Sequence, residues 1–214
     1  MSAYATIARS ASTEIEVKHS RFLAMVVRVD DDSSARAVIV EARKAHHDAR
    51  HHCSAFVLGP ESSIQRSNDD GEPSGTAGAP MLEVINGRGL SDVVAVVTRY
   101  FGGTLLGTGG LVRAYGDAVA TALDQAGVQQ RALHQIIDIT VPTGDAGRLD
   151  NQLRAFAQVR DVTYGSLATL NVAVPVTEVE SFREKLATFT GGVAIWQPLE
   201  TEWADVHIGE MLDP

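Results

Sequence analysis

Two glycine-rich loops that flank one apolar strand constrain this chain more than any other feature. The first glycine loop, Asp69–Gly78, lies in the run SNDDGEPSGTAGAP, and the second glycine loop, Gly102–Gly110, is the run GGTLLGTGG. The segment Asn68–Tyr115 that contains both loops holds more than half of the chain's 19 glycines. Glycine accepts positive φ and close approach, so we expect the two loops to form a recognition surface made largely of main chain.

The strand between the loops, DVVAVVTRYF at 92–101, carries five consecutive apolar residues, Val93–Val97. These residues do not alternate with polar ones. The pattern therefore predicts a strand that is central in its sheet and covered on both faces.

Composition sets the class of protein. The 214 residues are 44% hydrophobic and 21% charged, which is typical of a folded globular chain. No apolar run reaches the roughly 20 residues needed to cross a bilayer, and the N-terminal sequence has no apolar signal region, so we expect a cytoplasmic protein without membrane contact. A single cysteine, Cys53, fits a reducing compartment.

Charge limits the partners. The net charge is −9, with 12 basic against 15 acidic residues in 1–130 and 6 against 12 in 131–214. A nucleic acid would therefore need a local basic patch, and one candidate lies between Arg36 and Arg66, where five basic residues occur.

Hydrophobic periodicity predicts an α+β chain of two domains. In residues 1–132 we expect a mixed α/β layer with strands at 14–17, 21–29, 51–59, 63–70 and 92–101 and helices at 34–47, 81–87 and 111–126. In residues 133–200 we expect a ferredoxin-like β-α-β-β-α-β order, with strands at 136–141, 159–164, 168–174 and 193–196 and helices at 149–156 and 179–189. Residues 201–214 are expected to be an acidic tail that frays.

The first glycine loop contains three carboxylates, Asp69, Asp70 and Glu72, within four positions. They could hold a hard cation such as magnesium, but Asp-Gly and Pro-Ser-Gly are strong turn formers, and clustered acids in a turn are more often solvated. We favour the solvated turn. The amides of residues 75–78 could instead receive an anion or a partner's carboxylate.

The second glycine loop lies between a strand and a helix, where amides converge on a helix N-terminus. It lacks both the third small residue of a dinucleotide fingerprint and the lysine of a Walker motif. Arg99 and Arg113 flank the loop and could contact an anion, although either could simply pair with Asp92 or Asp117.

Four histidines (His46, His47, His51 and His52) precede Cys53 within eight positions, which raises the possibility of a zinc site. The run crosses a predicted helix end and an alternating strand, so its side chains should diverge. We expect a buried and inert Cys53, no bound metal and no cofactor.

The motifs NDDGEPSGTAGAP, RYFGG, LGTGGLVRAY and the weaker HHCSA resemble the IMPACT/YigZ family. The resemblance covers all but about the first dozen residues and the acidic tail. It implies an N-terminal domain like the second domain of a small-subunit ribosomal protein, a ferredoxin-like domain like one of elongation factor G, and a link to translation.

The leading hypothesis is a non-enzymatic translation-associated protein that contacts RNA, the ribosome or a translation factor. One alternative is a metal-assisted hydrolase acting on a phosphate ester or peptide, and another is a pure protein-interaction scaffold. The expected partner-binding residues are Asp69, Asp70, Gly71, Glu72, Pro73, Ser74, Gly75, Thr76, Arg99, Tyr100, Gly102, Gly103, Gly107, Gly109, Gly110 and Arg113. No catalytic set is expected.

Overall fold

The structure is a computed structural model that describes residues 1–206. The chain divides into two compact units, one formed by Met1 and Ala3–Gln130 and the other by Ser2 and the residues from Arg131 onward. Each unit has its own buried core. The expected α+β class is therefore confirmed.

The first unit contains a five-stranded antiparallel sheet in the order β2-β3-β6-β4-β5. Its strands are β2 (Ala11–Val17), β3 (Ser20–Arg28), β4 (His51–Leu58), β5 (Ile64–Asn68) and β6 (Val93–Tyr100). As the apolar run predicted, β6 is central, and its residues from Val93 to Arg99 are buried.

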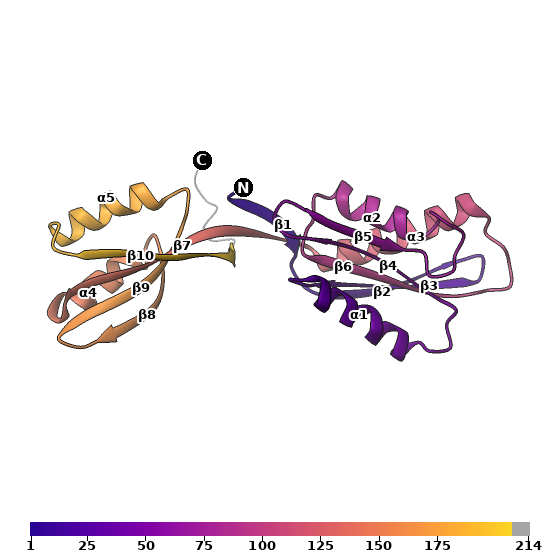
Figure 1. Ribbon diagram of the computed structural model, residues 1–214, viewed down its shortest axis with the longest axis horizontal. Coiled ribbons are helices and arrows are strands. Elements are labelled where there is room, and N and C mark those ends of the chain that lie inside the picture. The colour runs from indigo at the N-terminus through magenta and orange to yellow at the C-terminus, as the bar shows by residue number, and fades with distance from the viewer. Residues whose placement is uncertain (207–214) are drawn as a thin grey trace. The chain divides into compact units, whose positions relative to one another are not determined.

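Three helices cover the two faces of this sheet (Figure 1). They are α1 (Asp32–Ala45), α2 (Gly78–Gly87) and α3 (Thr108–Ala126). Alternate residues of β6 face opposite layers: Val94 and Val96 pack with α1, whereas Val93, Ala95 and Val97 pack with α2 and α3. This two-sided burial explains why β6 has no polar face.

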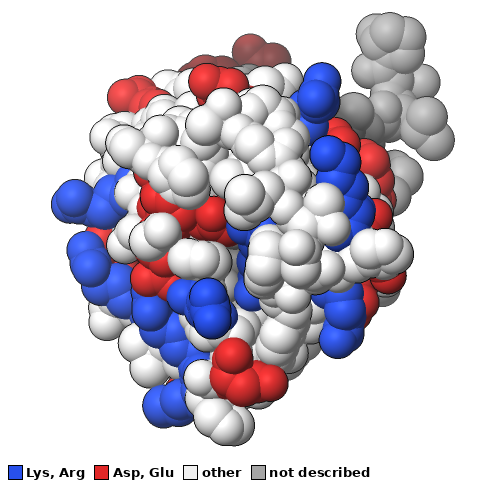
Figure 2. Space-filling view, turned by 90° about the vertical axis from the view of Figure 1, so that its right-hand side faces the viewer, with Lys and Arg blue, Asp and Glu red and all other residues white. Residues whose placement is uncertain are grey.

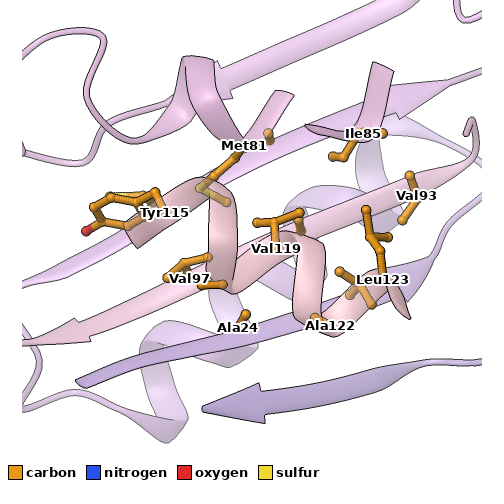
Figure 3. Packing of buried hydrophobic residues seen from close by; sticks show 14 of the residues in the cluster. Ala24, Met81, Ile85, Val93, Val97, Tyr115, Val119, Ala122 and Leu123 are labelled. Carbon is orange, nitrogen blue, oxygen red and sulfur yellow. The ribbon is translucent and has the colours of Figure 1, made fainter. Parts of the chain in front are cut away.

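The larger core lies between the sheet and helices α2 and α3 (Figure 3). Tyr115, Val119, Ala122 and Leu123 form the buried stripe of α3. Their spacing of three or four residues places them on one face of the helix. Tyr115 is fully buried and meets Phe22 of β3 edge to face, with ring centroids 5.2 Å apart. The stripe fixes the start of α3, and with it the end of the second glycine loop.

The second unit has the expected β-α-β-β-α-β order. Its elements are β7 (Val128–Pro142), α4 (Thr143–Leu153), β8 (Gln158–Tyr164), β9 (Leu167–Pro175), α5 (Val179–Thr190) and β10 (Ile195–Asp205). β7 lies between β9 and β10, and β8 pairs with β9, which is the strand order of a ferredoxin-like sheet. β7 begins in the first unit.

Two strands differ from the sequence-based expectation. The polar start of the chain contains β1 (Ala3–Ile7), a neighbour of β7, in which Tyr4 donates a buried hydrogen bond to Asp92. β10 does not stop at Trp196 but continues to Asp205, because Thr201–Asp205 pair with β7 after a register shift. Part of the expected acidic tail is therefore in a strand, and its remainder, 207–214, lies outside the described residues. No helix among the described residues is long and apolar enough to cross a membrane.

Candidate functional site

Asp69 organises the first glycine loop from within. Its carboxylate accepts hydrogen bonds from the backbone amides of Gly75 at 2.8 Å, Ala77 at 3.0 Å and Gly78 at 2.8 Å. Burial raises the pKa of the Asp69 carboxyl, but these three amides outweigh it and hold the pKa below its usual range. The amides that could have received an external anion are therefore occupied by the chain's own carboxylate, which also sits at the N-terminus of α2.

Asp70 joins the first glycine loop to the sheet and to α1. Its carboxylate accepts from the His52 amide at 2.7 Å and from the Arg43 guanidinium at 2.5 Å. Its carbonyl lies 2.9 Å from Nδ1 of His51. Asp70 has a φ of +45° and Gly71 a φ of +86°, so the chain turns sharply here. The expectation that this carboxylate is simply solvated is wrong, because it links three segments.

Glu72 is the buried centre of the site. Its Oε1 accepts from Nη1 of Arg99 at 2.7 Å and from the Tyr115 hydroxyl at 2.8 Å. The side chains of Arg99 and Glu72 are only 7% and 3% exposed, so the pair is shielded from water. Arg99 thus pairs with neither Asp92 nor Asp117, and the solvated interpretation is wrong for Glu72 as well. The ion pair connects the first glycine loop to β6 and α3.

The second glycine loop packs against the hairpin turn between β2 and β3. A Cβ built on Gly102 would lie 2.0 Å from the carbonyl carbon of His19, so only glycine fits there. The Ser20 hydroxyl accepts from the Gly102 amide at 3.1 Å and from Nη2 of Arg99 at 3.3 Å. The last three residues of the loop, 108–110, already belong to α3, whose N-cap is Gly107; Gly107 has a φ of +74° and offers no side-chain cap to the first turn.

A pocket of about 450 Å³ lies between the two glycine loops, and we call it the loop pocket. Glu72 and Pro73 contribute from the first loop, Arg99 from the end of β6, and Gly107 and Thr108 from the start of α3. Its apolar wall consists of Phe101, Leu105, Leu106 and Leu111, and Arg50 and His51 complete the lining. A pocket of about this volume, with few polar groups among apolar ones, is typical of a ligand-binding site.

Two of the apolar wall residues are strongly exposed. Leu105 is 83% exposed and Phe101 is 51% exposed. Phe101 and Arg50 also line a second hollow of about 250 Å³ beside Asp48 and Tyr100. Figure 2 views the end of the first unit that carries the second glycine loop, and it shows Lys and Arg side chains beside an uncharged surface with acidic groups among them.

The two arginines that line the loop pocket, Arg99 and Arg50, differ in whether their charge has a partner. Arg99 is paired with Glu72, and its guanidinium carbon lies 5.7 Å from the centroid of the Phe101 ring. Its Nε is buried and has no hydrogen-bond partner among the described residues. Arg50, by contrast, is exposed and makes no ion pair or hydrogen bond within residues 1–206. The pocket therefore has one unpaired positive charge at its rim.

The structure brings together part of the set expected from sequence. Glu72, Pro73, Arg99 and Gly107 line the loop pocket, whereas Asp69 and Asp70 shape the loop behind it. Other expected residues do not line it among the described contacts: Gly71, Ser74, Gly75, Thr76, Tyr100, Gly102, Gly103, Gly109, Gly110 and Arg113. Arg113 is exposed on α3, and Tyr100 donates to Asp48 at 3.0 Å.

The cluster of histidines and cysteine is held by separate partners. His46 contacts the Tyr100 hydroxyl, His51 the Asp70 carbonyl, and Nε2 of His52 the His46 carbonyl. In residues 1–206, no three His, Cys, Asp or Glu side chains gather as a metal site would require. Cys53 is buried as expected, and burial raises the pKa of its thiol to about 12, so it is a poor nucleophile.

The expected partner-binding residues did not include Arg50, Phe101, Leu105, Leu106 and Leu111, although Arg50 belongs to the candidate basic patch between Arg36 and Arg66. Arg50 lies far from the loops in sequence and reaches them only because β4 pairs with β6, placing His51 opposite Arg99. The adjacent leucines of the second glycine loop had a signal, because an apolar side chain in such a loop either packs on the core or is available to a partner. Leu106 packs on the core, whereas Leu105 is exposed.

Comparison with known proteins finds a matching family model for each unit. The Impact N-terminal domain model matches residues 18–123, and a domain of unknown function, DUF1949, matches 139–193. The IMPACT family member YvyE of Bacillus subtilis is 40% identical over 88% of this chain and 88% of its own. The IMPACT family member YigZ of Escherichia coli is 41% identical over 83% of this chain and 88% of its own. A solved structure of a hypothetical protein matches with a TM-score of 0.63 and 37% identity, covering 94% of this chain and 98% of that one.

Proposed function

Because the chain belongs to the IMPACT family, which is translation-associated, we propose that it is a non-enzymatic protein that contacts RNA, the ribosome or a translation factor through the loop pocket. The observation that carries the proposal is the pocket itself. Both glycine loops border it, its wall exposes Leu105 and Phe101, and Arg50 is unpaired at its rim within the described residues. Exposed apolar side chains beside a hollow are typical of interaction sites and ligand-binding grooves.

The internal hydrogen bonds of the first glycine loop support a binding role. Asp69 accepts from loop amides, Asp70 from His52 and Arg43, and Glu72 from Arg99 and Tyr115. A carboxylate must have free lone pairs directed at a common point to hold a cation with its neighbours. These three are directed at different protein donors. The arrangement therefore favours a rigid recognition loop over the metal-assisted hydrolase.

Affinity capture from a cell lysate, with and without nuclease, tests the proposal. We expect the unaltered protein to retain ribosomal components or translation factors, and the variant Leu105→Asp to lose them. Leu105 is almost fully exposed, so this change places a charge in the contact surface without disturbing the core. Loss of the partner on nuclease treatment would identify RNA, and retention would identify protein.

A matched control is Leu167→Asp, which alters another exposed leucine outside the loop pocket. The proposal fails if no component of translation is retained, or if both variants retain the same partners as the unaltered protein. A salt titration adds a second criterion, because contacts to phosphates make affinity fall steeply with ionic strength.

A further inference from the structure

We propose that the loop pocket binds an acidic segment of a partner protein, one that inserts a large apolar side chain beside a carboxylate. This inference rests on the proposed function and narrows it, since RNA, ribosome and protein partners are all compatible with that proposal. It follows from the charge and the wall chemistry of the pocket.

The polar groups of the loop pocket favour a negative ligand. Glu72 is the acidic lining residue, and its charge is already matched by Arg99. Arg50 then adds a positive charge that has no ion-pair partner among the described residues. Nδ1 of His51 donates to the Asp70 carbonyl, and a histidine ring adds no negative charge in either of its protonation states. The pocket is therefore positive within a chain whose net charge is −9.

The start of α3 adds to this polarity. Gly107 and Thr108 line the pocket, and no side chain caps the first turn of the helix. The free amides of a helix N-terminus favour a carboxylate, and a 19-residue helix has a well-developed dipole. Arg99, another lining residue, has a buried Nε without a hydrogen-bond partner in the described chain.

The apolar wall then distinguishes a peptide from a nucleic acid. Leu105, Leu106 and Leu111 offer aliphatic contacts that suit a leucine or phenylalanine side chain. A single strand of RNA needs a row of cations that follows its phosphates, in addition to stacking on a residue such as Phe101. At the loop pocket, Arg50 is the one arginine without an ion-pair partner among the described residues. Acidic side chains lie among the basic ones on the same face (Figure 2). An acidic and apolar peptide matches this surface better.

Fluorescence anisotropy with labelled probes tests the inference. The probe is the octapeptide GEDLFEDG, and its controls are GQNLFQNG, which removes the charges, and GEDAAEDG, which removes the apolar side chains. Octauridylate is the RNA probe. We expect the first peptide to bind at least about tenfold more tightly than both control peptides and the RNA. GQNLFQNG loses the charge-assisted hydrogen bonds, and GEDAAEDG loses the burial of its two apolar side chains.

Variants locate the binding. Arg50→Gln and Leu105→Asp should each weaken the first peptide by about tenfold or more. Arg183→Gln and Leu167→Asp, exposed residues of the second unit, should leave its affinity unchanged. Because the four positions are exposed, circular dichroism should show the same fold in every variant.

The outcomes separate this inference from the proposed function. If octauridylate binds in a Leu105-dependent way and the peptide does not, the acidic-peptide inference is wrong and the proposed function stands. If neither probe binds while lysate capture still depends on Leu105, the inference is again wrong and the proposed function again stands. If neither the probes nor the lysate reveal a Leu105-dependent partner, both are wrong.

Discussion

Replacing Glu72 by alanine would leave the Arg99 cation buried without its partner and remove the acceptor of the Tyr115 hydroxyl. Breaking a buried ion pair by deleting one member costs about 3–5 kcal/mol, because the remaining charge is left uncompensated. The side chain of Arg99 is only 7% exposed, so water can compensate little of that loss. A domain has about 5–15 kcal/mol of stability in total, and we therefore expect Glu72→Ala to leave the first unit marginally folded.

The assay can follow each unit separately. Both tryptophans, Trp196 and Trp203, lie in the second unit, so their fluorescence reports the unfolding of that unit alone. Far-UV circular dichroism reports both units. We expect Glu72→Ala to shift an early transition in the dichroism toward lower denaturant concentration while the tryptophan transition stays in place.

Two further variants grade the effect. Tyr115→Phe removes only one donor to the carboxylate, so it should cost about 1.5–3 kcal/mol, less than Glu72→Ala. The double variant Glu72→Leu/Arg99→Met replaces the pair by apolar side chains and should recover part of the loss, since no unpaired charge remains. The exposed pair Glu14–Arg21 is the control, and its removal should leave the transition unchanged. A Glu72→Ala transition that coincides with that of the unaltered protein would refute the structural role of the pair.

Two other predictions test the glycine loops. Gly102→Ala should severely destabilise the first unit, because the new Cβ would overlap the His19 backbone. Gly109→Ala has no atom within 4 Å of its Cβ position, so it should be neutral or stabilise the unit by up to about 1 kcal/mol. Thermal melts compare the two variants, and equal melting temperatures would contradict the packing of Gly102 against the hairpin turn. Asp69 has a lowered pKa, so its contribution to stability is present above the unfolded-state pKa and is lost as the pH falls through the folded value. The stability difference between the unaltered protein and Asp69→Asn should thus shrink on acidification from pH 7 to pH 3, and a constant difference would argue against the three amide bonds.

Periodicity was enough to predict most of the fold. The unbroken run Val93–Val97 predicted a central strand because burial on both faces leaves no position for a polar residue, and β6 confirms it. The sequence pattern did not predict β1, because AYATI is short and lies next to polar residues. The strand is stabilised by a hydrogen bond from Tyr4 to Asp92, a residue 88 positions away. The sequence pattern also did not predict the end of β10, because its residues from Thr201 onward pair with β7 without forming an apolar run.

The site was harder to predict than the fold, since its chemistry depends on which charges meet. The spacing of Asp69, Asp70 and Glu72 shows three acids in one turn, but it does not show that each turns toward a different donor. Glu72 meets Arg99 only because the loop folds back to the end of β6. Tyr115 joins them because the buried stripe of α3 brings its hydroxyl within 2.8 Å of the Glu72 carboxylate. These contacts occupy the charges that looked most functional in the sequence. What they leave exposed at the loop pocket are Arg50 and Leu105, neither of which belongs to the acidic motif, so the proposed function depends chiefly on residues outside that motif.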